Sequence, residues 1–263
     1  MKYLAIFRQS VLYFLVYRVR MAIWVINDSI NFLIFPFIWL AIYGSKETIA
    51  GYTKADIVTY FLVVIIVKLV SDSHVSNTMK EDVLEGRLNF YLVRPANFIF
   101  SRFLHEISYK TFSGMFYVPL LIIISLFFRQ YLVLPNSIGQ ALLFLISLFL
   151  ALVLSMAFQY IIGFACFWLG DNSGPSQVNH MADMIFSGRI APLVFFPPVL
   201  QFVASILPFQ YISYFPTQIF LNQIGYEEIL VGFLKAVIWI VAIWGTAYIM
   251  WRRGLKRYEG VGI

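Results

Sequence analysis

The chain has 263 residues, of which 61% are hydrophobic and only 12% are charged, and its mean hydropathy is +0.81. Soluble domains average roughly 25% charged residues, so this composition excludes an ordinary soluble domain and indicates a protein that lies in lipid. The formal net charge of +6 does not indicate nucleic-acid binding, because the basic residues cluster at the ends of apolar segments rather than on a soluble domain.

Residues 1–20 predict an amphipathic helix. Its basic residues are Lys2, Arg8, Arg18 and Arg20, and they are interleaved with leucine and phenylalanine. A helix of this kind lies in the headgroup layer with its cations toward anionic lipid. An N-terminal extension of the first membrane span is the alternative. We do not expect a cleavable signal peptide, because Arg18 and Arg20 interrupt the place of an unbroken apolar core.

Six apolar segments follow, and each is long enough to cross the hydrocarbon core of a bilayer. They cover about residues 21–43, 57–74, 107–128, 137–169, 179–207 and 229–251. All should be helices, because lipid offers no hydrogen-bond partner to a free backbone group. The sequence therefore predicts an all-α polytopic membrane protein in which residues 1–263 form one transmembrane domain.

The placement of basic residues predicts the orientation. Three groups of basic residues, at 1–20, 80–102 and 252–257, precede the first span, lie between the second and third spans, and follow the sixth span. An even number of spans separates these groups, so they share one side of the membrane. The loops on the opposite side hold only Lys46, Lys54 and Arg129. Loops rich in Lys and Arg stay on the cytoplasmic side. We therefore expect both termini in the cytoplasm.

The loop between the second and third spans carries the clearest functional pattern. Its charged residues are Glu81, Asp82, Glu85 and Arg87, and its apolar residues are Val83, Leu84, Leu88 and Phe90. A short amphipathic helix of this composition could dock into a groove of a cytoplasmic partner, with its charges setting the register. Gly86 would break or bend that helix. The alternative is a solvated connecting loop.

Charged residues also occur inside the predicted spans. These are Asp28, Lys68, Asp72, Asp183 and Arg189, with Glu106 and Lys110 near a span end. Such charges are costly in lipid unless they are paired or face water. Lys68 and Asp72 lie four residues apart, so a pair within one helix is expected. Structural pairing, the lining of a substrate path and a proton relay remain the three interpretations.

Residues 207–228 are apolar but are broken by Pro208 and Pro216, and they are too short for two crossings. A re-entrant or interfacial hairpin on the outer side, before the last span, fits this pattern. An ordinary aromatic-rich loop is the alternative. On the opposite side, residues 171–175 read Asp-Asn-Ser-Gly-Pro, which predicts a turn that serves as a tight connector or as a second partner contact.

Motifs for catalysis are absent from the sequence. It contains no phosphate-binding GxxxxGK[ST] loop, no HExxH, no GxSxG and no GxGxxG after a strand. The single cysteine, Cys166, cannot form an intrachain disulfide, and the three histidines lie far apart. We therefore expect no catalytic, metal or cofactor site in this chain, which leaves any motor to a separate subunit.

Three stretches together indicate a family. The first is residues 83–95, with a glycine, a short apolar run and the step Arg94-Pro95; the second is residues 187–197, continued at 207–209 and 214–216; the third is the tail at 251–262. In their order and in the number of spans, these stretches resemble the membrane subunit of ABC-2-type exporters, in a subfamily of six-span permeases.

The resemblance implies a role for each part. Residues 1–20 would be an interface helix beside an ATPase, and residues 81–88 would be the coupling helix. An outer gate and hairpin would be shaped by Pro192, Pro197, Pro208, Phe209 and Pro216. ATP and Mg²⁺ would bind two copies of a separate ABC ATPase subunit.

By the same resemblance, a second permease subunit, identical or paralogous, would complete the path. One chain would then form half of a translocation path for an amphipathic or hydrophobic substrate, in the bacterial cytoplasmic (inner) membrane. An ion-gradient-driven secondary transporter and a membrane scaffold or enzyme are the alternatives.

Overall fold

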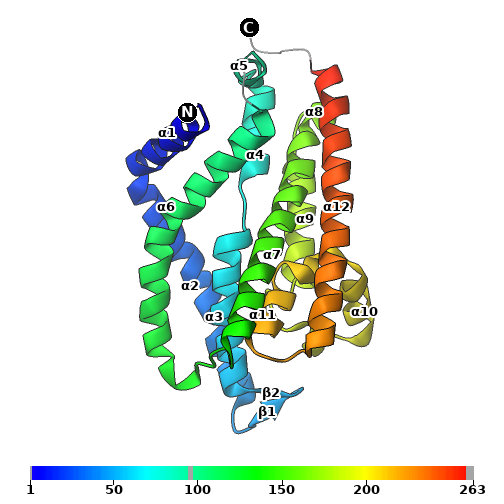
Figure 1. Ribbon diagram of the computed structural model, residues 1–263. Helices are drawn as coiled ribbons and strands as arrows, with labels where there is room; N and C mark the ends of the chain where they lie inside the picture. Colours follow the sequence, from blue (N-terminus) through cyan, green and yellow to red (C-terminus); the bar gives the residue numbers. More distant parts are fainter. Residues whose placement is uncertain (1, 94–96, 259–263) are drawn as a thin grey trace.

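The computed structural model describes residues 2–93 and 97–258, and in these ranges the chain is almost entirely helical (Figure 1). The first half contains α1 (Lys2–Val16), α2 (Arg18–Tyr43), α3 (Lys54–Ser71), α4 (Val75–Leu84), α5 (Leu88–Leu92) and α6 (Phe98–Phe127). The second half contains α7 (Ile138–Phe164), α8 (Cys166–Leu169), α9 (Ser173–Phe186), α10 (Pro198–Ile206), α11 (Tyr214–Phe220) and α12 (Tyr226–Arg257). The expected all-α class is confirmed apart from one small hairpin.

That hairpin joins α2 to α3. Its strands, β1 (Thr48–Ile49) and β2 (Tyr52–Thr53), are antiparallel and pair Thr48 with Thr53. Three short 3-10 turns complete the described chain: η1 (Arg129–Tyr131), η2 (Leu193–Phe195) and η3 (Pro208–Tyr211). The Arg94-Pro95 step and the tail from residue 259, which contributed to the family resemblance, lie outside the described residues.

Four helices in the described residues are long and apolar enough to cross a membrane: α2, α6, α7 continued by α8, and α12. They correspond to the first, third, fourth and sixth predicted spans. The second predicted span ends earlier than expected, because α3 stops at Ser71 and Asp72 is extended. Its 18 residues include three charged ones, Lys54, Asp56 and Lys68. Conversely, α6 starts at Phe98, well before the predicted boundary, because the Asn97 side chain caps it by accepting from the Phe100 N–H.

The prediction of one continuous helix over residues 179–207 is wrong. Helix α9 ends at Phe186 and α10 begins only at Pro198. Gly188 adopts a positive φ of 82°, and the prolines at 192 and 197 take extended backbone conformations, so the helix cannot continue. The freed carbonyls have partners in the protein: Ser187 accepts from the Tyr214 N–H at 2.7 Å and Gly188 from the Tyr60 hydroxyl at 2.6 Å.

The bundle has two distinct ends (Figure 1). The beginning of α1, the end of α12, and α4, α5 and α8 lie at one end, which we call the terminal end. The β1–β2 hairpin lies at the other, the hairpin end, and α10 and α11 lie in the half nearest to it. Helix α1 turns away from α2 at Tyr17 and packs against α6, which agrees with a separate N-terminal helix rather than an extension of the first span.

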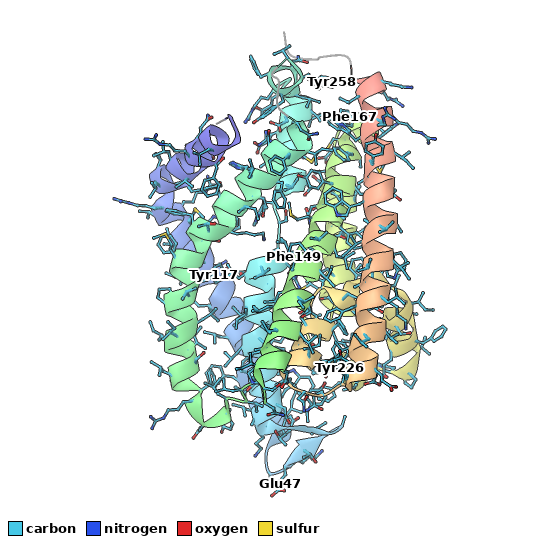
Figure 2. The ribbon with its side chains drawn as sticks, viewed as in Figure 1. Glu47, Tyr117, Phe149, Phe167, Tyr226 and Tyr258 are labelled. Carbon is cyan, nitrogen blue, oxygen red and sulfur yellow. The ribbon has the colours of Figure 1, made fainter. Side chains whose placement is uncertain are left out.

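Apolar side chains fill the interior and also cover much of the outside. Helix α3 is central: it packs against α2, α6, α7 and α11, and side chains such as Ile57 and Val64 are fully buried. Outward-facing residues of the long helices are apolar as well; Phe149 on α7, for example, is 61% exposed (Figure 2). An apolar exterior of this kind suits contact with lipid.

Close packing between α11 and α12 depends on Gly232. A Cβ atom added there would lie 2.2 Å from Cε2 of the Phe215 ring. That ring cannot move aside easily, because it is buried and packs edge-on against Tyr211 and Phe233.

We therefore expect Gly232→Ala to lower the free energy of unfolding by about 1–3 kcal/mol, the usual cost of overpacking. Thermal unfolding of the purified protein in detergent measures this. Gly245→Ala is the matched control, since it lies on the same helix with no atom within 4 Å of the added Cβ. Equal stability of the two variants would contradict the close-packing interpretation.

Candidate functional site

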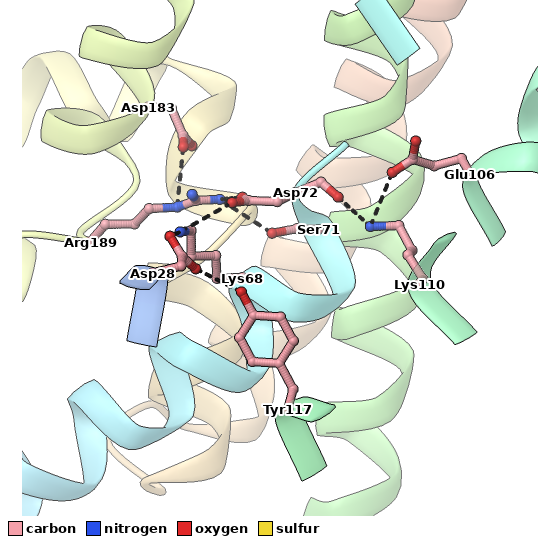
Figure 3. A network of polar contacts seen from close by, with 9 residues as sticks. All are labelled: Asp28, Lys68, Ser71, Asp72, Glu106, Lys110, Tyr117, Asp183 and Arg189. Carbon is pink, nitrogen blue, oxygen red and sulfur yellow. Dashed lines mark hydrogen bonds and ion pairs between the residues drawn. The ribbon is translucent and has the colours of Figure 1, made fainter. Parts of the chain in front are cut away.

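A network of charged side chains surrounds the gap between α3 and α4 (Figure 3). At its centre is Arg189, in the segment that follows α9, which is 4% exposed. Its Nη2 atom lies 2.7 Å from Oδ1 of Asp72, and its Nε lies 3.1 Å from Oδ2 of Asp183. It also donates to the Ser71 hydroxyl at 3.3 Å. Arg189 thereby connects the end of α3 to the broken segment after α9.

A second part of the network reaches α2 and α6 through Lys68. Its ammonium forms an ion pair with Asp28 on α2 and lies 3.6 Å from Oδ2 of Asp72. The Tyr117 hydroxyl on α6 donates to Asp28 at 2.8 Å. The predicted pair of Lys68 and Asp72 is therefore present, and Asp28 joins it from another helix.

The third part provides hydrogen-bond partners at the C-terminal end of α3. The backbone carbonyl of Asp72 accepts a hydrogen bond from Lys110 on α6. Lys110 also lies 3.8 Å from Glu106, whose other oxygen accepts from the His74 N–H at 3.3 Å. A helix end inside a membrane leaves carbonyls without partners, so a lysine placed there stabilises the break.

These contacts favour structural pairing over the proton-relay interpretation. Each of the three cations, Lys68, Lys110 and Arg189, has a carboxylate within 4 Å. Charges in a low-dielectric interior are tolerated when they are paired in this way. Asp28, Lys68, Asp72, Asp183 and Arg189, which were singled out from the sequence, all belong to one network. Ser71 and Tyr117 were missed, because their hydroxyl groups carry no signal of depth or pairing in the sequence.

A second candidate region lies at the terminal end, in α4, α5 and the start of α6. Gly86, with a φ of 71°, separates α4 from α5, as predicted. Of the residues proposed to contact an ATPase, Glu81, Leu84, Glu85 and Arg87 are exposed. Asp82, Gly86 and Leu88 are buried in the chain, on the side of the segment that packs against the rest of the bundle.

The buried side of this region is organised by one ion pair. Asp82, on α4 and 1% exposed, pairs with Arg102 on α6. The Arg102 guanidinium carbon also lies 4.9 Å from the ring centre of Tyr91 on α5. Arg102 therefore fixes α4 and α5 to α6. Sequence reasoning placed Arg102 only among the basic loop residues, because a pair separated by 20 positions leaves no local pattern.

On the exposed side of this region, the charged residues form solvent-exposed ion pairs with one another. Arg87 donates from Nε to Glu85 at 2.8 Å and lies 3.7 Å from Glu81. Exposed ion pairs contribute little to stability, so these charges can exchange partners at small cost. We call Glu81, Leu84, Glu85 and Arg87 the coupling surface.

The connector at residues 171–175 packs against α4. Asp171 forms an ion pair with Lys80, and the hydrogen bond from Lys80 lowers the pKa of Asp171 to about 2. The Asn172 side chain donates to the Ser76 carbonyl at 2.9 Å. These contacts support the tight-connector interpretation.

Residues predicted for an outer gate lie toward the hairpin end. Pro192 and Pro197 fall in the break after α9, Pro208 and Phe209 form η3, and Pro216 lies inside α11. Phe209 stacks on Phe158 of α7 with ring centres 4.9 Å apart. Helix α11 packs on α3 and α7, and Gln140 donates to the carbonyls of Ile219 and Phe220 near its end.

The network predicts a large effect of removing its central cation. We expect Arg189→Met to destabilise the protein by about 3–5 kcal/mol, because Asp183 would remain buried without its partner. Thermal unfolding in detergent micelles is the measurement. Adding Asp183→Asn removes the orphaned charge, so the double variant should unfold at a higher temperature than Arg189→Met. A double variant that is no more stable would contradict the pairing.

The Asp82–Arg102 pair predicts a pH dependence. Burial raises the pKa of Asp82 to about 6 from an ordinary value of 3.8, although Arg102 opposes the shift. The folded state thus retains the Asp82 proton between these pH values while the unfolded chain releases it. The wild type should therefore gain stability relative to Asp82→Asn as the pH falls through this window, and should lose that advantage as the pH rises through about 6.

The pair itself should show the opposite trend. In a double-mutant cycle with Asp82→Asn and Arg102→Leu, the interaction energy should be larger at about pH 7.5 than at about pH 5, because only ionised Asp82 attracts the guanidinium. Unfolding at the two pH values measures it. An interaction energy that does not change with pH would argue against a titrating, buried Asp82.

Comparison with known proteins agrees with this architecture. The family described as ABC-2 family transporter protein matches residues 29–262, which is most of the chain. No curated protein matched it. The match includes helices α3 to α12, the coupling surface and the charge network apart from Asp28, and membership implies association with an ABC ATPase. The chain belongs to the ABC-2 transporter family, and it is a multi-pass membrane permease of an ABC transporter.

Proposed function

We propose that this chain is the permease subunit of an ATP-driven exporter and forms half of a dimeric path for an amphipathic or hydrophobic substrate. The sequence contains no phosphate-binding loop. The energy would therefore come from two copies of a separate ABC ATPase, which would hold ATP and Mg²⁺. A second permease, identical or paralogous, would supply the other half of the path.

The observation that carries this proposal is the coupling surface and its buried anchor. The exposed charges of α4 and Arg87 are available to a partner, while Asp82 behind them is tied to Arg102 on α6. A partner that pushed on α4 would therefore move α6 as well. Complementary charges would set the register of such a contact and speed its formation.

The path from the coupling surface into the membrane follows α6. Arg102, Glu106 and Lys110 are spaced by four residues, so they lie along one face of this helix. Lys110 holds the end of α3, and Tyr117 further along holds Asp28 on α2. A displacement of α6 would reach the charge network and, through Arg189, the broken segment near the hairpin end.

The orientation that we propose places the terminal end in the cytoplasm of a bacterial inner membrane, with both termini inside. The excess of Lys and Arg at that end supports it. The hairpin at residues 48–53 and the segment from Pro192 to Pro216 would then form the outer side, where they would gate the exit.

Charge reversal on the coupling surface should weaken the complex with the ATPase. We expect Glu85→Arg and Arg87→Glu each to reduce its affinity at least about tenfold, equivalent to about 1.4 kcal/mol, and to lower ATP hydrolysis by the complex. Glu47→Arg is the control, because Glu47 is exposed at the hairpin end. Co-purification and phosphate release are the readouts.

Unchanged binding and hydrolysis in both variants would remove the coupling-surface assignment. Substrate movement in vesicles that have a proton gradient but no ATPase would favour an ion-driven transporter instead.

Cysteine labelling tests the orientation. In a Cys166→Ala background, Glu47→Cys should react with a membrane-impermeant maleimide in intact cells. Glu85→Cys should react only after the cells are permeabilised. Both side chains are exposed to solvent in the structure. A difference in labelling between them therefore reports the side of the membrane and not burial within the protein. Labelling of Glu85→Cys in intact cells would reverse the proposed topology.

A further inference from the structure

A polar cavity of about 300 Å³ lies beside the charge network. It is bounded by α4, α7, α9 and the segment that carries Arg189. Asp183 and Arg189 line it on one side and Ser155 and Gln159 of α7 on the other, with Phe158 as an apolar part of the wall. This volume matches the lower range of small-ligand sites.

The charges that line this cavity do not balance. Of the charge network, Asp72, Asp183 and Arg189 line it, beside His74 and His180. Two acids and one base leave one excess negative charge when the histidines are counted as neutral. In a membrane interior an uncompensated charge is costly. A cationic group in the cavity would restore the balance.

One atom shows where that cation would bind. Asp183 is 8% exposed and lines the cavity. Its Oδ2 pairs with Arg189, whereas its Oδ1 is buried and receives no well-aligned hydrogen bond among the described residues, although the Ser187 hydroxyl lies close to this carboxylate. A buried acceptor that lacks a donor is unfavourable. The site therefore favours an occupant that both carries positive charge and donates hydrogen bonds.

We propose that this cavity binds the primary ammonium group of an amphipathic molecule. This inference rests on the proposed function, and it narrows the substrate class. An ammonium has three donors, one for Asp183 Oδ1 and others for the hydroxyl and amide oxygens of α7. The apolar part of such a molecule would contact Phe158 and Ile212, the apolar residues of the cavity wall.

The test is binding to the purified full chain in maltoside micelles, without ATPase or nucleotide, at about pH 8, where a primary alkylamine is still protonated. The probes are dodecylamine and dodecyltrimethylammonium, which carry the same charge and tail but differ in N–H donors. We expect dodecylamine to bind the wild type at least tenfold more tightly, measured by calorimetry. Equal affinities of the two probes would overturn the proposal.

Two variants locate the binding at the cavity. Asp183→Asn should weaken dodecylamine binding at least tenfold by removing the excess charge. Ser155→Leu fills the cavity from α7 without touching an ion pair of the network and should abolish binding. Asp171→Asn, which is exposed and outside the cavity, is the control and should bind as the wild type does. Wild-type affinity in both cavity variants would place the binding elsewhere and overturn the proposal.

Two sources could supply the ammonium, and a further arm separates them. Dihexanoyl phosphatidylethanolamine, compared with dihexanoyl phosphatidylcholine, tests an aminophospholipid of the bilayer, whereas dodecylamine tests a free amphiphilic amine. Tighter binding of dodecylamine than of dodecyltrimethylammonium, or of the phosphatidylethanolamine than of the phosphatidylcholine, supports the site. The pair that shows the difference identifies the source of the ammonium group. Because the assay contains no ATPase, its failure is distinct from failure of the coupling-surface predictions.

Discussion

The ion pair between Arg189 and Asp72 is the contact on which the interior of this protein depends. Each of these residues lies at a place where a helix stops: Asp72 ends α3, and Arg189 follows the end of α9. A broken helix exposes backbone groups, and lipid cannot satisfy them. Bringing the two breaks together lets charged side chains and free carbonyls serve as partners for one another.

Helix α6 gives this centre a connection to the terminal end. Its residues Arg102, Glu106 and Lys110 occupy one face and contact successively α4, the start of α4 and the end of α3. A helix transmits displacement along its axis with little internal change, because its backbone hydrogen bonds all lie within the segment. The buried pair at Asp82 and the charge network are therefore connected through α6.

The same arrangement explains why a polar cavity can exist inside an apolar protein. The cavity lies where the gap between α3 and α4 and the break after α9 meet α7, and Asp72, Asp183 and Arg189, which pair there, also line it. Around this interior, the exposed surfaces of α2, α6, α7 and α12 remain apolar. The charges of the network thus meet at the end of α3 and at the break after α9.

By itself, the sequence determined the membrane environment, the helical class, four long spans, the glycine break at Gly86 and the identity of the intramembrane charges, because these follow from composition and from patterns within about 20 residues. Only the tertiary structure decided that residues 179–207 break in two, that Asp82 faces inward to Arg102, and that Tyr117 and Ser71 join Arg189 and Asp28 in one network. Those features depend on contacts between residues from 20 to more than 100 positions apart. A local pattern records which side chains need a partner, but only the packing of the helices determines which partner each one finds.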